Sequence, residues 1–213
     1  PGRFCKKIMK IVVAASDEQW GTLTRNRPKV EWLRVGNCTE FIQHKTADAY
    51  FNLTDNIAFT GYTLPEKPVI INAVSKTLKE LNAPVNVLRI NGWNVFLQRS
   101  TWEIAGVITE KIKSLFKSID IKITAVADEP GLIAARVVSM IVNEAYFTVA
   151  DNVSTKDEID TAMKLGTNYP YGPFEWAESI GNENILALLQ KLSLTDGRYQ
   201  PSALLIKEVN EKK

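Results

Sequence analysis

The stretch from Asp157 to Glu178 reads DEIDTAMKLGTNYPYGPFEWAE and decides the fold of the second half of the chain. The hydroxyl groups of Ser154–Thr155 predict the N-cap of a helix that opens this stretch. Gly166 predicts its end, because glycine is common just past a helix C-terminus. Two prolines then favour an extended connection, in which Gly172 is free to take positive φ, and a second helix is expected from near Phe174. A helix, a rigid turn and a second helix are more often structural than catalytic.

Two segments of this stretch, Ile159–Gly166 and Tyr169–Glu175, read IDTAMKLG and YPYGPFE. They closely resemble a signature in the C-terminal domain of 3-hydroxyacyl-CoA dehydrogenases. The resemblance extends from Pro130–Gly131 to Pro201–Ser202, and more weakly back to about Lys67. It implies a Rossmann-like domain, which binds NAD in that family, followed by an all-α helical domain.

The composition is that of an ordinary globular protein of 213 residues, with 26 lysines and arginines against 24 acidic residues. Such a balance gives no electrostatic basis for binding nucleic acid or an anionic membrane. The sequence holds no apolar run of transmembrane length, so no membrane partner is expected. Cys5 and Cys38 make neither a disulfide framework nor a metal-ligand spacing, which favours a reducing cytoplasm. The run from Met9 is typical of a natural start, so residues 1–8 are interpreted as a foreign leader.

The first half of the chain alternates strand and helix patterns. Short runs rich in isoleucine and valine are typical of buried parallel strands. The alternation predicts an α/β domain with a mostly parallel sheet, and the short segment from Arg25 to Leu64 makes it a trimmed Rossmann-like domain. The expected strands cover residues 10–15, 30–35, 49–53, 68–73, 86–90, 102–104 and 120–127, and the expected helices cover residues 75–81 and 107–118.

The phosphate-binding loop of a dinucleotide site is missing from its usual place after the first strand. That loop would supply a G-x-G-x-x-G pattern, whose glycines let the backbone approach the pyrophosphate. The sequence from Ala14 to Trp20 contains no glycine and carries Asp17 and Glu18. After the second strand, Asn37 stands where an acidic residue would hold the ribose. We therefore expect no cofactor and assign no cofactor-binding residues.

The resemblance implies a catalytic His–Glu pair, in which the histidine precedes the glutamate by twelve residues. The segment Trp102–Ile104 resembles the strand that carries the glutamate, which makes Glu103 its counterpart. Twelve residues earlier stands Asn91 in place of the histidine. An asparagine amide has no nitrogen that titrates near neutral pH, so it cannot act as a general base. Glu103 is then a vestigial catalytic residue, or equally a structural carboxylate at a strand end.

Other family positions are kept in part. Asn94 matches the asparagine after the histidine, whereas the following proline is Val95. In the segment that normally presents a substrate-binding serine, Val74 takes the expected place and Ser75 lies one residue on. The lone histidine, His44, lies in a polar patch and is interpreted as a surface residue.

The segment from Leu132 to Val149 is apolar on most faces, with Arg136 and Glu144 as its charged residues. A helix of this kind is buried on most faces. In the family this helix lies at the centre of a dimer, and the resemblance implies a homodimer through Leu132–Val149. Its Arg136 is a family residue, whereas Ala135 replaces the family asparagine.

These observations predict a degenerate Rossmann-like domain over residues 9–127 and a helical domain over residues 128–213. The function predicted is that of a 3-hydroxyacyl-CoA dehydrogenase relative that has lost NAD binding and hydride transfer. It would act as a binding or assembly protein, for an acyl-CoA-like ligand held between the domains or for a partner. One alternative is an active NAD-dependent dehydrogenase of fatty-acid metabolism. Another is a different reaction on a similar thioester that uses Glu103.

Overall fold

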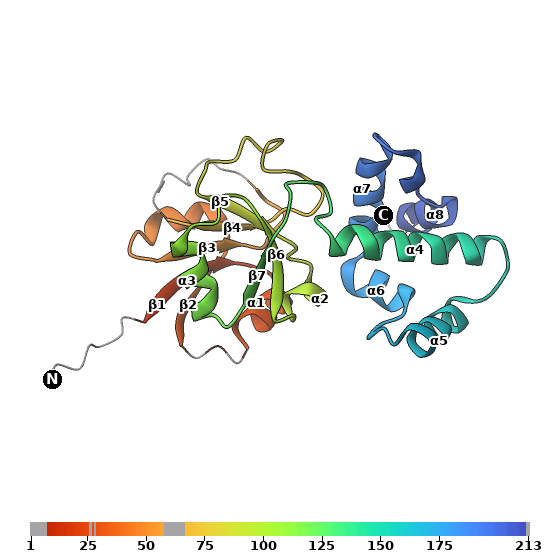
Figure 1. Cartoon of the computed structure of the whole chain (residues 1–213), viewed down its shortest axis with the longest axis horizontal. Helices are drawn as coiled ribbons and strands as arrows, with labels where there is room; N and C mark the ends of the chain where they lie inside the picture. Colours follow the sequence, from red (N-terminus) through yellow and green to blue (C-terminus); the bar gives the residue numbers. More distant parts are fainter. Residues whose placement is uncertain (1–7, 26, 28, 58–66, 212–213) are drawn as a thin grey trace. The chain divides into compact units, whose positions relative to one another are not determined.

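The computed structural model describes residues 8–25, 27, 29–57 and 67–211. The chain divides into two compact units, residues 1–128 and 129–213 (Figure 1). The first is an α/β unit and the second is helical, as the sequence predicts. Apart from Ile8, the leader assigned to residues 1–8 lies outside the described residues.

The first unit is built on a seven-stranded sheet in the part of the chain that the structure describes, with strand order β2-β1-β3-β4-β5-β6-β7. Neighbouring strands are parallel except β5 and β6, which are antiparallel. The elements are β1 (Met9–Ala14), α1 (Asp17–Thr24), β2 (Val30–Val35), η1 (Cys38–Gln43), β3 (Ala49–Asn52), β4 (Val69–Asn72), β5 (Val87–Ile90), α2 (Asn94–Leu97), β6 (Thr101–Ala105), α3 (Glu110–Ser118) and β7 (Lys122–Ala125).

Alternate residues of each strand enter two different cores, because successive side chains of a strand point to opposite faces. Ile11 and Val13 of β1 pack in one core with residues of α1 and α3. Val12 and Ala14 pack in the other core with residues of η1. Both faces of the sheet are therefore covered, which explains why its strands read as continuous apolar runs.

The segment Ser75–Leu81 forms turns, so the prediction of a helix there was wrong. One helical turn does form, in which the N–H of Leu81 donates to the carbonyl of Thr77 at 3.1 Å. Asn82 then adopts a left-handed φ of 48°, and Pro84 follows. A left-handed residue and a nearby proline both end a helix, so the apolar pattern is not extended.

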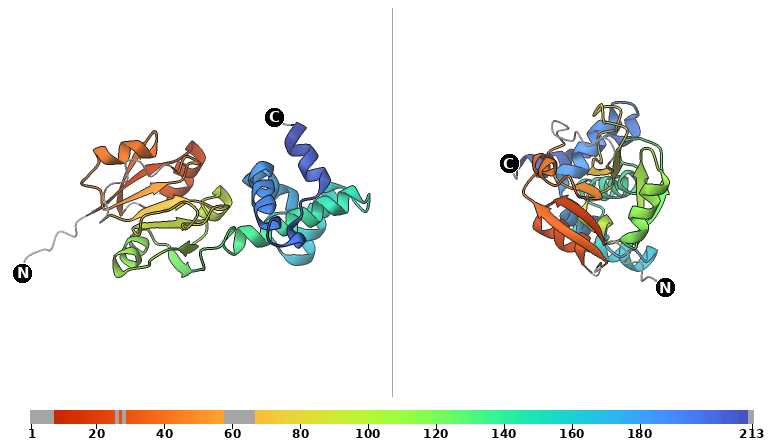
Figure 2. Two further views of the ribbon diagram at one scale, coloured as in Figure 1. Left: turned by 90° about the horizontal axis from the view of Figure 1, so that it is seen from above. Right: turned by 90° about the vertical axis from the view of Figure 1, so that its left-hand side faces the viewer.

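The helical unit is organised around α4, which contacts each of α5 to α8. Figure 2 shows this long helix running through the unit, with the later helices beside it. It begins two residues after the predicted Leu132, which has a left-handed φ of 50°. The elements are α4 (Ala134–Ala150), α5 (Lys156–Thr167), α6 (Pro173–Ile180), α7 (Asn182–Ser193), η2 (Gly197–Tyr199) and α8 (Ala203–Glu211).

The signature segments hold α5 against α6. Asp160 on α5 accepts hydrogen bonds from the backbone N–H groups of Phe174, at 2.8 Å, and Glu175, at 3.1 Å. Those N–H groups lie in the first turn of α6, where helix donors lack intrahelical partners. Lys164 of α5 also forms an ion pair with Glu175. These parts of the signature therefore form a structural clasp.

Two details of this stretch differ from the prediction. Thr155 caps α5 as expected, with Glu158 completing a capping box. The helix nevertheless runs through Gly166 to Thr167, and Asn168 takes the left-handed conformation at its end. Gly172 has a φ of −74° and therefore does not supply positive φ.

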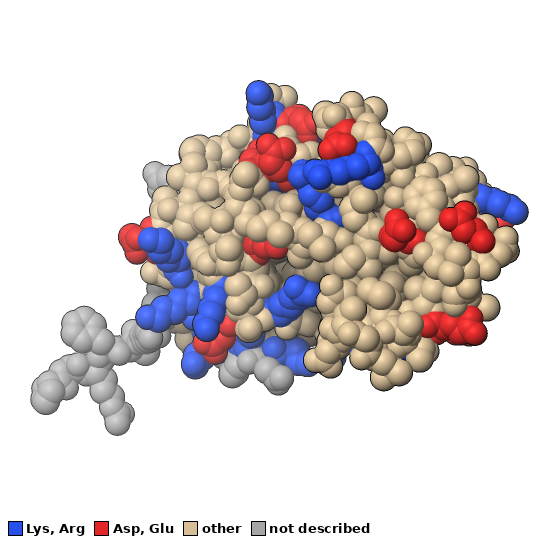
Figure 3. Space-filling view, turned by 45° about the vertical axis from the view of Figure 1, so that its right-hand side comes forward, with Lys and Arg blue, Asp and Glu red and all other residues tan. Residues whose placement is uncertain are grey.

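None of the described helices is long and apolar enough to cross a membrane. On the face drawn in Figure 3, basic and acidic side chains are mingled and separated by uncharged surface.

Candidate functional site at the carboxyl edge of the sheet

The candidate site lies where β1, β3, β4 and β5 end. In this sheet β1 lies between β2 and β3, so the chain connections diverge between β1 and β3. Ligands of open α/β sheets bind in the crevice outside the carboxyl ends of the strands at such a switch point. The residues that follow these strands are therefore the ones that would meet a ligand.

Gln19 on α1 bridges two strand ends at this edge. Its side-chain Nε2 donates to the carbonyl of Leu53, just after β3, at 2.9 Å, and to the carbonyl of Gly92, after β5, at 3.1 Å. Its Oε1 accepts the backbone N–H of Ser16 at 3.1 Å. The Ser16 hydroxyl in turn accepts the backbone N–H of Gln19 at 3.2 Å, which completes a capping box. The backbone N–H groups of Ser16 and Gln19 at the start of α1 are thus occupied by side chains of the same segment.

Acidic groups lie in the first turn of α1. Asp17 forms an ion pair with Arg34 of β2 at 2.6 Å. Arg34 also donates to the carbonyl of Ala15 at 2.9 Å and lies over the ring of Trp20, 5.9 Å from its centroid. The nearby arginine is therefore already paired with a carboxylate and a carbonyl.

Asn72 and Gly92 hold the ends of β4 and β5 together. The N–H of Gly92 donates to Oδ1 of Asn72 at 3.0 Å, and Nδ2 of Asn72 donates to the carbonyl of Leu53 at 3.4 Å. A Cβ on Gly92 would lie 2.7 Å from Cβ of Asn72. Only glycine allows this close approach of the two strand ends.

Asn91 and Glu103 lie opposite one another if the register of β5 and β6 continues by one residue beyond the Ile90–Ile104 pair. The match of Asn91 and Glu103 to the family His–Glu pair predicts that the Asn91 amide donates a hydrogen bond to the Glu103 carboxylate. That prediction is wrong. Oδ1 of Asn91 accepts the N–H of Trp93 at 3.2 Å, whereas its buried Nδ2 has no hydrogen-bond partner among the described residues. The short Asn91–Trp93 turn sets the direction of the amide.

Asn94 lies in α2, and Ser75 lies in the segment that follows β4. Asn94 opens α2, where its Oδ1 accepts the Thr22 hydroxyl at 2.8 Å and its Nδ2 donates to Glu18. It therefore joins α2 to α1. Ser75 is half-buried in the turns after β4, next to the buried Val74.

Two further candidate residues have local structural roles. Asn37 caps η1 by accepting the N–H of Thr39 at 2.9 Å. His44, the only histidine in the sequence, follows η1 on the approach to the amino end of β3. Asn91 follows the carboxyl end of β5, and β3, β4 and β5 are parallel. His44 thus lies toward the amino ends of the parallel strands, whereas Asn91 lies at their carboxyl ends.

The hydrogen bonds at the carboxyl edge of the sheet involve Gln19, a residue that the sequence analysis did not predict to be part of the site. The Ser16-x-x-Gln19 spacing of a capping box was visible in the sequence. Its contacts to Leu53 and Gly92 span 34 and 73 residues. No local pattern announces contacts at such distances.

The chain is similar in sequence to several dehydrogenases of 3-hydroxyacyl-CoA compounds, according to their names. Residues 131–213 match the profile described as 3-hydroxyacyl-CoA dehydrogenase, C-terminal domain. The 3-hydroxybutyryl-CoA dehydrogenase of Clostridioides difficile is 32% identical over 145 residues, which are 64% of this chain and 52% of that protein. The 3-hydroxyadipyl-CoA dehydrogenase of Escherichia coli K12 is 46% identical over 82 residues, 38% of this chain and 17% of that protein. The matches thus span about half or less of these relatives.

The fold is also that of solved structures. The crystal structure of (S)-3-hydroxybutyryl-CoA dehydrogenase from Ralstonia eutropha matches with a TM-score of 0.73 and 16% identity. The match covers 97% of this chain and 95% of that chain. At this identity the likeness concerns the fold alone.

Proposed function

We propose that this chain is a member of the 3-hydroxyacyl-CoA dehydrogenase family that has lost NAD binding and hydride transfer. It acts as a binding or assembly protein for an acyl-CoA-like ligand or partner. The observation that carries this proposal is the position of Gln19. Its side chain joins Leu53 to Gly92 at the strand ends where a dinucleotide would lie.

The electrostatics of the same place support the proposal. A helix N-terminus binds phosphate through its free N–H groups and its positive dipole end. In α1 the N–H of Gln19 is already taken by Ser16, and Asp17 and Glu18 place carboxylates in the first turn. A pyrophosphate would therefore meet two carboxylates against one guanidinium, that of Arg34, and fewer free donors.

The proton chemistry of the family pair is also missing. Asn91 replaces the histidine and cannot titrate near neutral pH. Glu103 is kept, but a carboxylate that orients a base has no base to orient. Without a base and a bound nicotinamide there is no hydride acceptor and no route for the hydroxyl proton.

Assembly into a homodimer through α4 is the second part of the proposal. One side of α4 faces its own unit, whereas a stripe on the other side exposes large apolar side chains. Such a stripe on a soluble protein is typical of an interaction surface. The exposed fractions are 54% for Ile133, 52% for Val137 and 38% for Phe147.

Calorimetric titration of the full chain with acetoacetyl-CoA, free CoA and NADH tests the ligand part of the proposal. Saturable heat with acetoacetyl-CoA, weaker heat with free CoA and none with NADH is the expected result. Free CoA is the control that separates recognition of the acyl group from recognition of the nucleotide. Oxidation of 3-hydroxybutyryl-CoA with NAD would contradict the proposal and favour an active dehydrogenase. Absence of heat with acetoacetyl-CoA would contradict the proposal that the chain binds an acyl-CoA-like ligand.

A further inference from the structure

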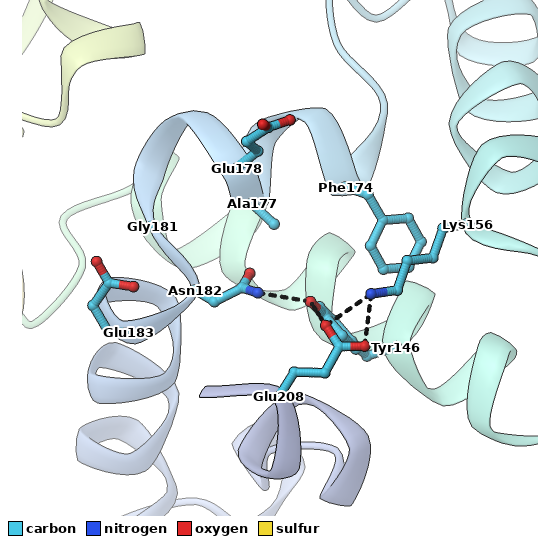
Figure 4. Close-up of a pocket in the computed structure, with 9 residues that line it drawn as sticks. All are labelled: Tyr146, Lys156, Phe174, Ala177, Glu178, Gly181, Asn182, Glu183 and Glu208. Carbon is cyan, nitrogen blue, oxygen red and sulfur yellow. Dashed lines mark hydrogen bonds and ion pairs between the residues drawn. The ribbon is translucent and has the colours of Figure 1, made fainter. Parts of the chain in front are cut away.

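A separate pocket is lined by residues of the helical unit alone. It has a volume of about 410 Å³, which is within the range of small-molecule sites. Figure 4 shows its lining, drawn from α4, the start of α5, α6, the start of α7 and α8. The lining residues are Tyr146, Lys156, Phe174, Ala177, Glu178, Gly181, Asn182, Glu183 and Glu208.

One side of the pocket already holds an ammonium group of the chain itself. Nζ of Lys156 lies 5.1 Å from the ring centroid of Tyr146 and 5.2 Å from that of Phe174. It donates to both carboxylate oxygens of Glu208, at 2.6 and 2.7 Å. Two aromatic faces and a carboxylate are the groups that recognise an organic ammonium ion. The position of Lys156 thus shows that this side of the pocket can bind an ammonium group.

The side chain of Asn182 lines the same pocket and is held by Tyr146. The single proton of the Tyr146 hydroxyl is donated to Glu208 at 2.9 Å, because a carboxylate can only accept. Burial, followed by this hydrogen bond, raises the pKa of Tyr146 well above its usual range, so the phenol keeps its proton. Its oxygen must then accept from Nδ2 of Asn182, at 2.9 Å. That bond orients the amide.

The carbonyl oxygen of the Asn182 amide, unlike its nitrogen, is not used in a hydrogen bond within the described residues. Oδ1 is buried and has no hydrogen-bond partner among the described residues. A buried acceptor without a donor is costly, and a donor supplied by a ligand would remove that cost. The pocket therefore favours a ligand that carries N–H groups.

The net charge of the lining also selects a cation. The lining holds three carboxylates, those of Glu178, Glu183 and Glu208, and one ammonium group, that of Lys156, which pairs with Glu208. An anion would meet more charges of its own sign than of the opposite sign, whereas a cation meets the reverse.

We propose that this pocket binds a small organic cation bearing a primary ammonium group. Its N–H groups donate to Oδ1 of Asn182 and to the carboxylates of the lining, and its alkyl part packs against Phe174 and Ala177. The same ammonium chemistry is offered by a free amine and by a lysine side chain. The site is independent of the carboxyl edge of the sheet.

Calorimetric titration with putrescine and with Nα-acetyl-lysine amide, which keeps its side-chain ammonium group, tests whether the pocket binds an amine. Succinate is the four-carbon anion for comparison. Saturable binding of putrescine alone identifies a free amine, and saturable binding of the lysine derivative identifies a side chain. Binding of succinate as tight as that of the amines, or absence of amine binding at millimolar concentration, overturns the proposal.

Substitution of the internal ammonium gives the sharper test. Lys156→Gln vacates the two rings and Glu208, so amine affinity should rise about tenfold. Lys207→Gln is the matched control, because it removes one positive charge on α8 that pairs with Glu211 instead. The double variant Glu178→Gln/Glu183→Gln should weaken amine binding about fivefold at low salt. Equal affinities for Lys156→Gln and Lys207→Gln, with melting curves that show both folded, would overturn the proposal.

Discussion

A Cβ on Gly172 would lie 2.3 Å from the carboxyl carbon of Asp160. The glycine is therefore required so that Asp160 can reach the first N–H groups of α6, at 2.8 and 3.1 Å. The family signature is explained here by helix packing: its aspartate, its glycine and its Lys164–Glu175 ion pair all join α5 to α6.

Gly172→Ala should lower the free energy of unfolding by about 1–3 kcal/mol, because Asp160 must move and leave N–H groups of α6 without a partner. Gly166→Ala is the matched control. A Cβ there meets no atom within 4 Å, and a helical alanine should stabilise by about 0.5–1 kcal/mol. Denaturant unfolding of the full chain measures both. Equal changes in the free energy of unfolding for the two substitutions would contradict the claim that Gly172 is required for the contact between Asp160 and α6.

The clasp should also weaken in acid. The hydrogen bond from Lys164, followed by that from the Gly172 N–H, lowers the pKa of Glu175. A group with a lowered folded-state pKa contributes stability above its unfolded pKa of about 4.3 and loses it as the pH falls through the folded value. The destabilisation caused by Glu175→Gln should therefore be present at pH 7 and vanish in strong acid. Melting temperatures measured across this range, with Glu110→Gln as an exposed ion-pair control, test this. An effect of Glu175→Gln that is independent of pH would refute it.

Much of the sheet could be predicted from the sequence, because buried strands carry continuous apolar runs. The second strand was predicted at Val30–Val35 and has those bounds. The turn that ends at Asn82 was missed, since its left-handed conformation interrupts an apolar pattern that is otherwise typical of a helix.

The candidate site was predictable only in part. The spacing to Glu103 predicts that Asn91 lies on a neighbouring strand end, and Asn91 directly follows β5, which pairs with β6. The hydrogen bond between them does not form: Oδ1 of Asn91 accepts from Trp93, and its buried Nδ2 has no partner among the described residues. The position of Gln19 depends on contacts with distant residues, which only the folded chain reveals.

The proposed dimer predicts the effect of a charge on the exposed stripe of α4. Val137 is 52% exposed and belongs to this stripe, so Val137→Asp should convert a dimer to a monomer or cause aggregation. Leu194→Asp places the same charge on an exposed leucine outside α4 and should leave the assembly unchanged. Light scattering at micromolar protein measures both. A monomer before any substitution would contradict the proposed dimer.

Restoring the histidine alone should not restore the enzyme. Asn91→His supplies a general base, which contributes only about 10²–10⁴-fold to a rate. Without bound NAD the hydride has no acceptor, so formation of NADH from 3-hydroxybutyryl-CoA should stay undetectable. The unmodified chain is the control. Turnover by Asn91→His would show that the cofactor binds despite Gln19 and the two carboxylates.

The most direct test of the central claim is a fluorescence titration of the unmodified chain with NADH. Gln19 closes the start of α1, and Asp17 and Glu18 repel a pyrophosphate, so the emission of NADH should show no saturable enhancement up to millimolar concentration. A saturable enhancement would contradict the account and return this chain to the NAD-binding dehydrogenases.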